Sequence, residues 1–177
     1  GRNFEYFSED PYLTGKMGAA YVKGVQEKGV GACPKHFAAN NQENGRQYVS
    51  SEVDERTLRE IYLKPFEIVE KESRPWSIMC SYNRLNGVYA SEHKQLLQEI
   101  LRDEWGFDGI VISDWGAVKN RAYSLLASIE MCMPYQEEAF GQLQEAYENG
   151  IIDDEVIDEA LTRLFLYYDR TKGVYEE

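Results

Sequence analysis

A short apolar run, residues 109–112, is followed by Ser113, Asp114 and Trp115. A run of this length suits a strand that is buried on both faces, as in a parallel sheet covered by helices. Asp114 would then emerge at the carboxyl end of the strand, where barrel enzymes carry their catalytic groups. A carboxylate beside an indole that can stack on a sugar ring suits a nucleophile or an electrostatic stabiliser.

The position of Asp114 also has a structural interpretation. A helical segment is predicted from about residue 117, and aspartate is a frequent N-cap at a strand-to-helix junction. The local pattern by itself favours this cap. The other strand ends must therefore decide between a cap and a catalytic group.

Polar residues also end the two preceding predicted strands, with Lys35 and His36 after the first and Tyr82 after the second. Singly, these residues suit structural roles: an ion-pair partner, a semi-buried imidazole and a phenol hydrogen-bonded to the backbone. Because the carboxyl ends of parallel strands converge, we expect these three side chains to line one cleft with Asp114. An ammonium and an imidazole can bind ring hydroxyls while a carboxylate faces the anomeric carbon.

The elements that must position these residues alternate along the chain. Strands are predicted at residues 31–37, 76–82, 109–114 and 128–133, and helices at 11–28, 54–71, 91–105, 117–126, 136–148 and 154–168. Pro65 inside the second helix predicts a kink. Four alternations of this kind indicate parallel βα units. With 177 residues the chain is one domain's length, below the roughly 250 residues of a complete eight-stranded barrel, and we expect it to be a piece of something longer.

The composition narrows the classes of partner. The net charge is −12, from 31 acidic and 19 basic residues, which argues against nucleic acid and anionic membranes as ligands but is compatible with a neutral sugar. Neither an apolar run long enough to span a bilayer nor a leader peptide is visible. The three widely spaced cysteines predict buried free thiols. Together these features lead us to expect a cytoplasmic protein without a metal site or cofactor.

Several segments resemble the N-terminal barrel domain of glycoside hydrolase family 3, the β-glucosidases and their relatives. The resemblance runs in order over nearly the whole chain, through GRNFEYFSEDPYL, GACPKHFAANNQENGRQ, VDERTLREIYLKPFE, IMCSYNRLNGVYASE, LLQEILRDEWGFDGIVISDWGAV and SIEMCMP. It implies an α/β fold in which residues 1–177 form a single partial TIM-barrel domain, a half-barrel of about four parallel βα units. It also implies retaining hydrolysis of terminal β-D-glycosyl residues, for which no metal or organic cofactor is needed.

The resemblance assigns roles by position. Asp114 matches the catalytic nucleophile, and the residues that match glycone-binding positions are Arg2, Lys35, His36 and Tyr82. Arg46 matches a basic residue of the loop after the first strand, where it would position Glu43 or an inner carboxylate, or form part of an ion-pair scaffold. Trp115 matches an aromatic residue beside the sugar, with packing on the following helix as the alternative.

Two departures and two absences limit the expected activity. Glu130 stands where the family has aspartate and Cys132 where it has an acidic residue, which puts the geometry of the last strand in doubt. An early-strand aspartate and the general acid/base of the family do not match any residue here. A half-barrel would expose two sheet edges, so we expect self-association or pairing with a complementary barrel segment. The alternative function is a non-catalytic half-barrel that is structural or binds sugar.

Overall fold

The computed structural model describes residues 1–174. The α-helices are α1 (Pro11–Gln26), α2 (Glu55–Thr57), α3 (Lys64–Ser73), α4 (Arg121–Leu126), α5 (Glu137–Glu148) and α6 (Asp154–Thr171). Two segments are π-helical, η2 (Leu58–Leu63) and η4 (Gln95–Glu104), and three are 3-10 turns, η1 (Asn3–Glu5), η3 (Ala90–Glu92) and η5 (Lys172–Val174). The strands are β1 (Ser50–Ser51), β2 (Ser77–Cys80), β3 (Arg84–Leu85), β4 (Val88–Tyr89) and β5 (Ile110–Ser113).

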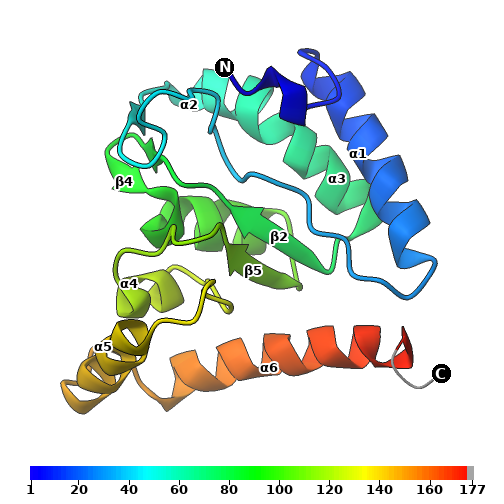
Figure 1. Ribbon diagram of the computed structural model, residues 1–177. Coiled ribbons are helices and arrows are strands. Elements are labelled where there is room, and N and C mark those ends of the chain that lie inside the picture. The colour runs from blue at the N-terminus through cyan, green and yellow to red at the C-terminus, as the bar shows by residue number, and fades with distance from the viewer. Residues whose placement is uncertain (175–177) are drawn as a thin grey trace.

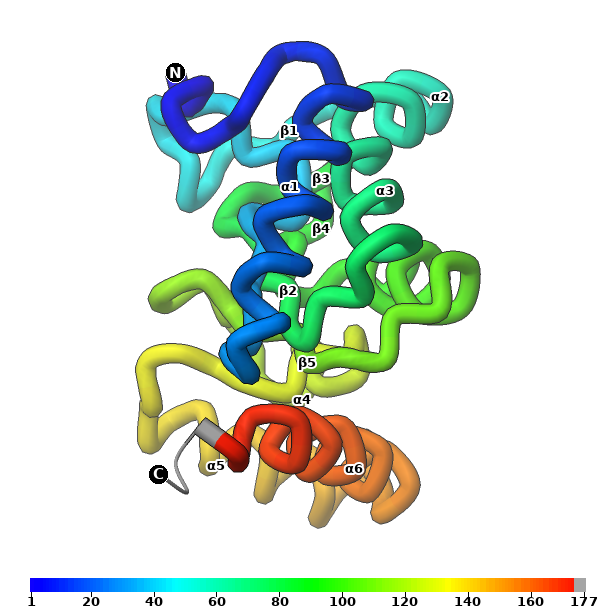
Figure 2. Tube along the Cα trace, turned by 90° about the vertical axis from the view of Figure 1, so that its right-hand side faces the viewer, coloured from blue at the N-terminus to red at the C-terminus, as the bar shows by residue number. Residues whose placement is uncertain are grey.

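The parallel pair β2 and β5 forms the middle of the fold, with Ser77 opposite Ile110 and Cys80 opposite Ser113. An extended segment, residues 32–37, lies along the other side of β2, and residues 129–131 lie along the other side of β5. These four segments lie side by side in the order 32–37, β2, β5 and 129–131. In Figures 1 and 2, α1 and α3 lie on the side of residues 32–37, and α6 lies on the side of residues 129–131. The described residues therefore form an open α/β row of four parallel segments and no closed barrel.

The first predicted strand is paired but irregular. Ser77 N–H donates to Ala32 O at 3.3 Å and Met79 N–H to Pro34 O at 3.1 Å, as a parallel ladder requires. Between these two bonds a regular ladder would take an N–H from residue 34 to Ser77 O, and proline lacks that N–H. After them it would take the N–H of residue 36 to Met79 O, but Phe37 N–H donates to Met79 O instead, at 2.9 Å, so the register shifts by one residue. The prediction of a regular strand at residues 31–37 was therefore wrong, although the segment lies where that strand was expected.

The fourth predicted strand is reduced to one bridge between Met131 and Ile112. Glu130 N–H and Met131 N–H both donate to Val111 O, at 3.1 and 3.2 Å, and the side chain of Glu130 adds further bonds. Glu130 is fully buried and accepts two hydrogen bonds from Arg102 at 2.8 Å, one from Val111 N–H at 2.7 Å and one from Arg163 of α6 at 3.1 Å. The glutamate that departs from the family pattern thus ties α6 and η4 to β5.

Helix starts and breaks differ from the predictions in three places, the first being the helix predicted at residues 91–105, which is a 3-10 turn, η3, followed by the π-helical η4. The helix predicted at residues 54–71 is divided, and its π-helical middle ends directly before α3, where Pro65 provides no backbone N–H for an α-helical bond. The helix predicted from residue 117 begins only at Arg121, because Asn120 is its N-cap and accepts from Tyr123 N–H at 3.0 Å. By contrast, α1 begins at Pro11 after the predicted cap Asp10.

The apolar side chains of the row and its helices form one main cluster around Phe37, Ile78, Leu97, Leu101 and Val111. All three cysteines are free thiols, as predicted, but only Cys80 is buried, and burial raises its pKa to about 12. Among residues 1–174, no helix has the length and apolar character needed to span a bilayer.

Candidate active site

Asp114 emerges directly after β5, at the carboxyl end of the parallel pair. Its Oδ1 accepts a hydrogen bond from Trp115 N–H at 2.7 Å, and its side chain remains 13% exposed. Because Asn120 caps α4, the interpretation of Asp114 as a helix cap was wrong. The carboxylate is therefore held by its own turn and is open to a ligand.

The backbone around Asp114 is fixed by Ser113. Ser113 N–H donates to Met131 O at 2.8 Å, and its hydroxyl both accepts from Met133 N–H at 2.8 Å and donates to Met133 O at 3.2 Å. Gly116 N–H donates to the same Met133 carbonyl at 2.8 Å. The serine in the SDW motif thus pins the residues after β5 to the neighbouring segment and limits the directions that Asp114 can take.

His36 lies between two carboxylates. Its Nε2 is 3.4 Å from Asp114 Oδ2, and its Nδ1 is 3.4 Å from Glu5 Oε2. The side chain is 3% exposed. Burial lowers the pKa of His36 most strongly, the positive charge of Lys35 lowers it further, and the two carboxylates act in the opposite direction. The imidazole is therefore favoured in its neutral form beside the carboxylate of Asp114.

Arg2 reaches this cluster through Glu5. Arg2 Nε donates to Glu5 Oε2 at 3.0 Å, a second guanidinium nitrogen bonds Glu5 Oε1, and the third bonds Glu43. These bonds raise the pKa of Arg2, with the hydrogen bond to Glu5 as the largest cause. Glu5 was not among the residues predicted from the sequence, although its spacing of three residues from Arg2 suits an ion pair. The Glu43 side chain pairs with Arg2, and Arg46 contacts Glu43 through its backbone, where Arg46 N–H donates to Glu43 O at 3.3 Å.

Tyr82 lies near Asp114, and Arg46 contacts the Tyr82 ring. The Tyr82 hydroxyl donates its single hydrogen to Trp115 O at 2.6 Å, and burial together with the nearby charge of Asp114 raises the Tyr82 pKa. The Arg46 guanidinium lies 4.9 Å from the centre of the Tyr82 ring, a cation–π contact. The Trp115 side chain is 65% exposed, so it does not pack on the following helix.

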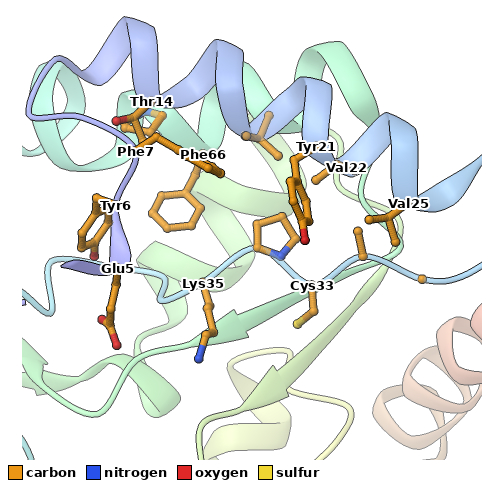
Figure 3. Close-up of a pocket in the computed structure, with 16 residues that line it drawn as sticks. Glu5, Tyr6, Phe7, Thr14, Tyr21, Val22, Val25, Cys33, Lys35 and Phe66 are labelled. Atoms are coloured by element: carbon orange, nitrogen blue, oxygen red, sulfur yellow. The ribbon is translucent and has the colours of Figure 1, made fainter. Parts of the chain in front are cut away.

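Lys35 lies apart from the cluster around Asp114. Its side chain is exposed, and no carboxylate lies within ion-pair distance of it in the part of the chain that the structure describes. Figure 3 shows Lys35 and Glu5 extending in the same direction, away from α1, at the border of a cavity of about 390 Å³. His36, Tyr82 and Asp114 do not line that cavity. The cluster and the cavity are thus separate features that meet at Glu5 and Lys35.

The arrangement suits attack by one carboxylate better than a two-carboxylate reaction within these residues. Asp114 is ionisable, partly open and flanked by an exposed indole. Glu5, the carboxylate on the far side of His36, is already engaged by Arg2. It is therefore not a free proton donor. Within residues 1–174, no group of three or more His, Cys, Asp or Glu side chains could hold a metal ion.

A family model and the sequences of known proteins both match this chain to glycosyl hydrolases. The model of the family described as "Glycosyl hydrolase family 3 N terminal domain" matches residues 1–166. "Thermostable beta-glucosidase B" of Acetivibrio thermocellus is 52% identical over 93% of this chain and 22% of its own length. "Exo-alpha-(1->6)-L-arabinopyranosidase" of Bifidobacterium longum is 48% identical over 98% of this chain and 23% of its own length.

Solved structures give the same result for the fold. Beta-glucosidase 3B from Thermotoga neapolitana, in complex with glucose, superimposes with a TM-score of 0.94 at 46% identity, over 98% of this chain and 25% of that chain. The beta-glucosidase of Bifidobacterium adolescentis gives a TM-score of 0.95 at 46% identity, over 99% and 26% of the two chains. The chain thus spans about a quarter of the length of the proteins that it matches.

Proposed function

Since this chain belongs to glycosyl hydrolase family 3, we propose that it is the nucleophile-bearing part of a retaining β-glycosidase, with Asp114 as the nucleophile. The observation that carries this proposal is the open carboxylate of Asp114 at the carboxyl end of β5, held against the neutral imidazole of His36 at 3.4 Å. A carboxylate in this position can attack a sugar ring that stacks against the exposed indole of Trp115.

The proposed reaction has two steps. An oxygen of Asp114 bonds to the anomeric carbon, and the glycosidic bond breaks with its electron pair going to the leaving oxygen, which takes a proton from a general acid. Water then attacks the anomeric carbon and gives its proton to the conjugate base of that acid, and the bond to Asp114 breaks with its electron pair restoring the carboxylate. Glu5 is engaged by Arg2, so we infer that the acid belongs to a part of the enzyme other than residues 1–177.

The substrate that we propose is a glycoside or oligosaccharide with a terminal β-linked sugar, of which glucose is the first candidate. A solved relative holds glucose, and several relatives are described as β-glucosidases. Arg2, His36 and Tyr82 would lie around the glycone, while Lys35 would reach it from the border of the cavity. Relatives described as arabinopyranosidases make arabinopyranosides the second sugar to test.

We propose further that residues 1–177 form one partial barrel domain and that a complementary barrel segment covers its open end. Large apolar residues are exposed there, on η1, on α1 and on the segment between them: Phe4, Phe7, Tyr12, Leu13, Met17 and Tyr21. The edge of residues 32–37 that faces away from β2 is the place where a further parallel strand could pair. Analytical ultracentrifugation of the chain alone should show oligomers, and adding a complementary barrel segment should convert them to a complex of one chain with one segment. A well-behaved monomer that binds no hydrophobic dye would contradict this proposal.

A non-catalytic sugar-binding module is the second candidate, favoured by the engagement of Glu5 with Arg2. A 2-deoxy-2-fluoro-β-glucoside with a dinitrophenolate leaving group separates the two, because this leaving group departs without a proton from a general acid. A covalent adduct supports the glycosidase. Measurable binding of glucose without any adduct supports the module.

A further inference from the structure

Glu5 joins two residues that the proposed function places around the sugar. It accepts two hydrogen bonds from Arg2, of which the one from Nε is 3.0 Å long, and its Oε2 lies 3.4 Å from His36 Nδ1. The Glu5 side chain is 14% exposed, and His36 is 3% exposed. Glu5 comes from η1 and His36 from the segment beside β2, so the contact couples two parts of the fold.

The two nitrogens of His36 are not equivalent. Nδ1 is sealed from solvent and makes no hydrogen bond, and the Glu5 carboxylate is the acceptor beside it. Nε2 points to Asp114 Oδ2. Four charged groups act on the pKa of this ring: Lys35 and Arg2 lower it, and Asp114 and Glu5 raise it. In its neutral form the imidazole carries one hydrogen, for which the two carboxylates compete.

The burial of Nδ1 decides this competition. With the hydrogen on Nε2, the lone pair of Nδ1, which is sealed from solvent, would face the Glu5 carboxylate without a hydrogen-bond donor. With the hydrogen on Nδ1, the sealed nitrogen becomes an N–H that faces an acceptor, and the lone pair lies instead on Nε2, opposite Asp114 Oδ2. When one ring nitrogen carries the hydrogen and faces a carboxylate, the other ring nitrogen is left without a hydrogen and can accept a hydrogen bond.

We propose that Glu5 is a positioning residue, which orients Arg2 and holds His36 with its hydrogen on Nδ1. Nε2 is then left as an acceptor beside Asp114, ready for a hydroxyl group of the sugar. The assignment of a sugar as the ligand rests on the proposed function. The state of His36 in the free protein does not.

The chain contains a built-in reference for the test. His93, the only other histidine, accepts a hydrogen bond from Leu96 N–H on its Nδ1 at 3.3 Å, so its neutral form carries the hydrogen on Nε2. Long-range ¹⁵N–¹H correlation spectra of the full 177-residue chain should therefore show opposite tautomers for the two histidines. Two histidines with the hydrogen on Nε2 would overturn the proposal.

The variant Glu5→Gln tests the role of the carboxylate. Its amide can turn an N–H toward Nδ1, so the hydrogen of His36 should move to Nε2, and the His36 pKa should fall because a neighbouring negative charge is lost. Glu43→Gln is the matched control, since it also removes a carboxylate from Arg2 but does not contact His36. Its His36 signals should match those of the parent chain.

Each outcome has one meaning. If Glu5→Gln leaves the His36 tautomer unchanged in a chain with a native backbone spectrum, Glu5 does not hold His36. If the variant fails to fold, the tautomer of the parent chain still decides the proposal. A failure of the fluoroglucoside to label the chain would contradict the proposed function and leave the tautomer result untouched.

Discussion

His36 Nε2 lies 3.4 Å from Asp114 Oδ2, and the opposite nitrogen of the same ring lies 3.4 Å from Glu5 Oε2. The three residues come from η1, from the segment beside β2 and from the end of β5. Burial keeps the ring favoured in its neutral form although carboxylates stand on both sides. Within residues 1–174, no lysine or arginine lies within ion-pair distance of the Asp114 carboxylate, and its neighbour His36 is favoured in the neutral form.

A first prediction concerns Trp115. Its side chain is 65% exposed, so Trp115→Ala should change the free energy of unfolding by no more than about 0.5 kcal/mol. The affinity for glucose should fall about tenfold, which equals roughly 1.4 kcal/mol, because the indole is the stacking surface beside Asp114. Calorimetric titration and urea unfolding measure the two effects. Tyr123→Ala, at a 54% exposed position in α4, is the control and should leave the affinity unchanged.

A second prediction concerns Glu130. Its carboxylate is buried and paired with Arg102 and Arg163, and burial lowers the Arg102 pKa to about 10. Glu130→Gln leaves a buried guanidinium without its counter-ion, so it should cost about 3 kcal/mol or more in urea unfolding. Glu159→Gln removes the exposed partner of Arg163 and should cost less than about 1 kcal/mol. Equal costs for the two variants would mean that the buried pair has no special role.

A third prediction follows from Glu70, a buried residue of α3. Its Oε1 accepts from Arg74 at 3.2 Å, whereas its Oε2 has no hydrogen-bond partner among the residues of the structure. Burial raises the Glu70 pKa from 4.5 to about 7. Between these values the unfolded chain releases the proton more readily than the folded chain, so this carboxyl destabilises the fold as the pH rises.

The variant Glu70→Gln removes that effect. It should stabilise the chain at pH 8 by about 1 to 3 kcal/mol, and the gain should shrink toward zero at pH 5, as followed by denaturant unfolding. Glu67→Gln is the control with the opposite sign. Hydrogen bonds to Lys64 and Lys71 lower the Glu67 pKa despite partial burial, so its loss should destabilise the chain at neutral pH. A gain for Glu70→Gln that is the same at both pH values would contradict the titration of Glu70.

The sequence predicted the position of Asp114 correctly for a simple reason. A four-residue apolar run of mostly β-branched residues suits a central strand buried on both faces, and the residue after such a strand leaves the sheet at the carboxyl end. The helix after it was placed too early. Residues 116–118 are small or apolar and look helical, but Asn120 can accept from Tyr123 N–H, and this cap sets the start of α4.

Other features depend on contacts that no local pattern contains. Glu5 and His36 are 31 residues apart, and only the packing of η1 against the segment beside β2 brings them together. The irregularity of the first strand could have been predicted from the sequence, because Pro34 has no backbone N–H to donate to a parallel ladder. The buried group around Glu130 was not, since Arg102 and Arg163 lie on two separate helical segments that converge only in the folded chain.

The covalent labelling of Asp114 by a dinitrophenyl 2-deoxy-2-fluoro-β-glucoside tests the account most directly. Peptide mapping by mass spectrometry should find one fluoroglucosyl group per chain, on Asp114, and Asp114→Asn should reduce the labelling rate by about 10³-fold or more. Asn keeps an oxygen that can accept from Trp115 N–H, so this variant should stay folded. A label on another carboxylate, or unchanged labelling of Asp114→Asn, would contradict the assignment of Asp114 as the nucleophile.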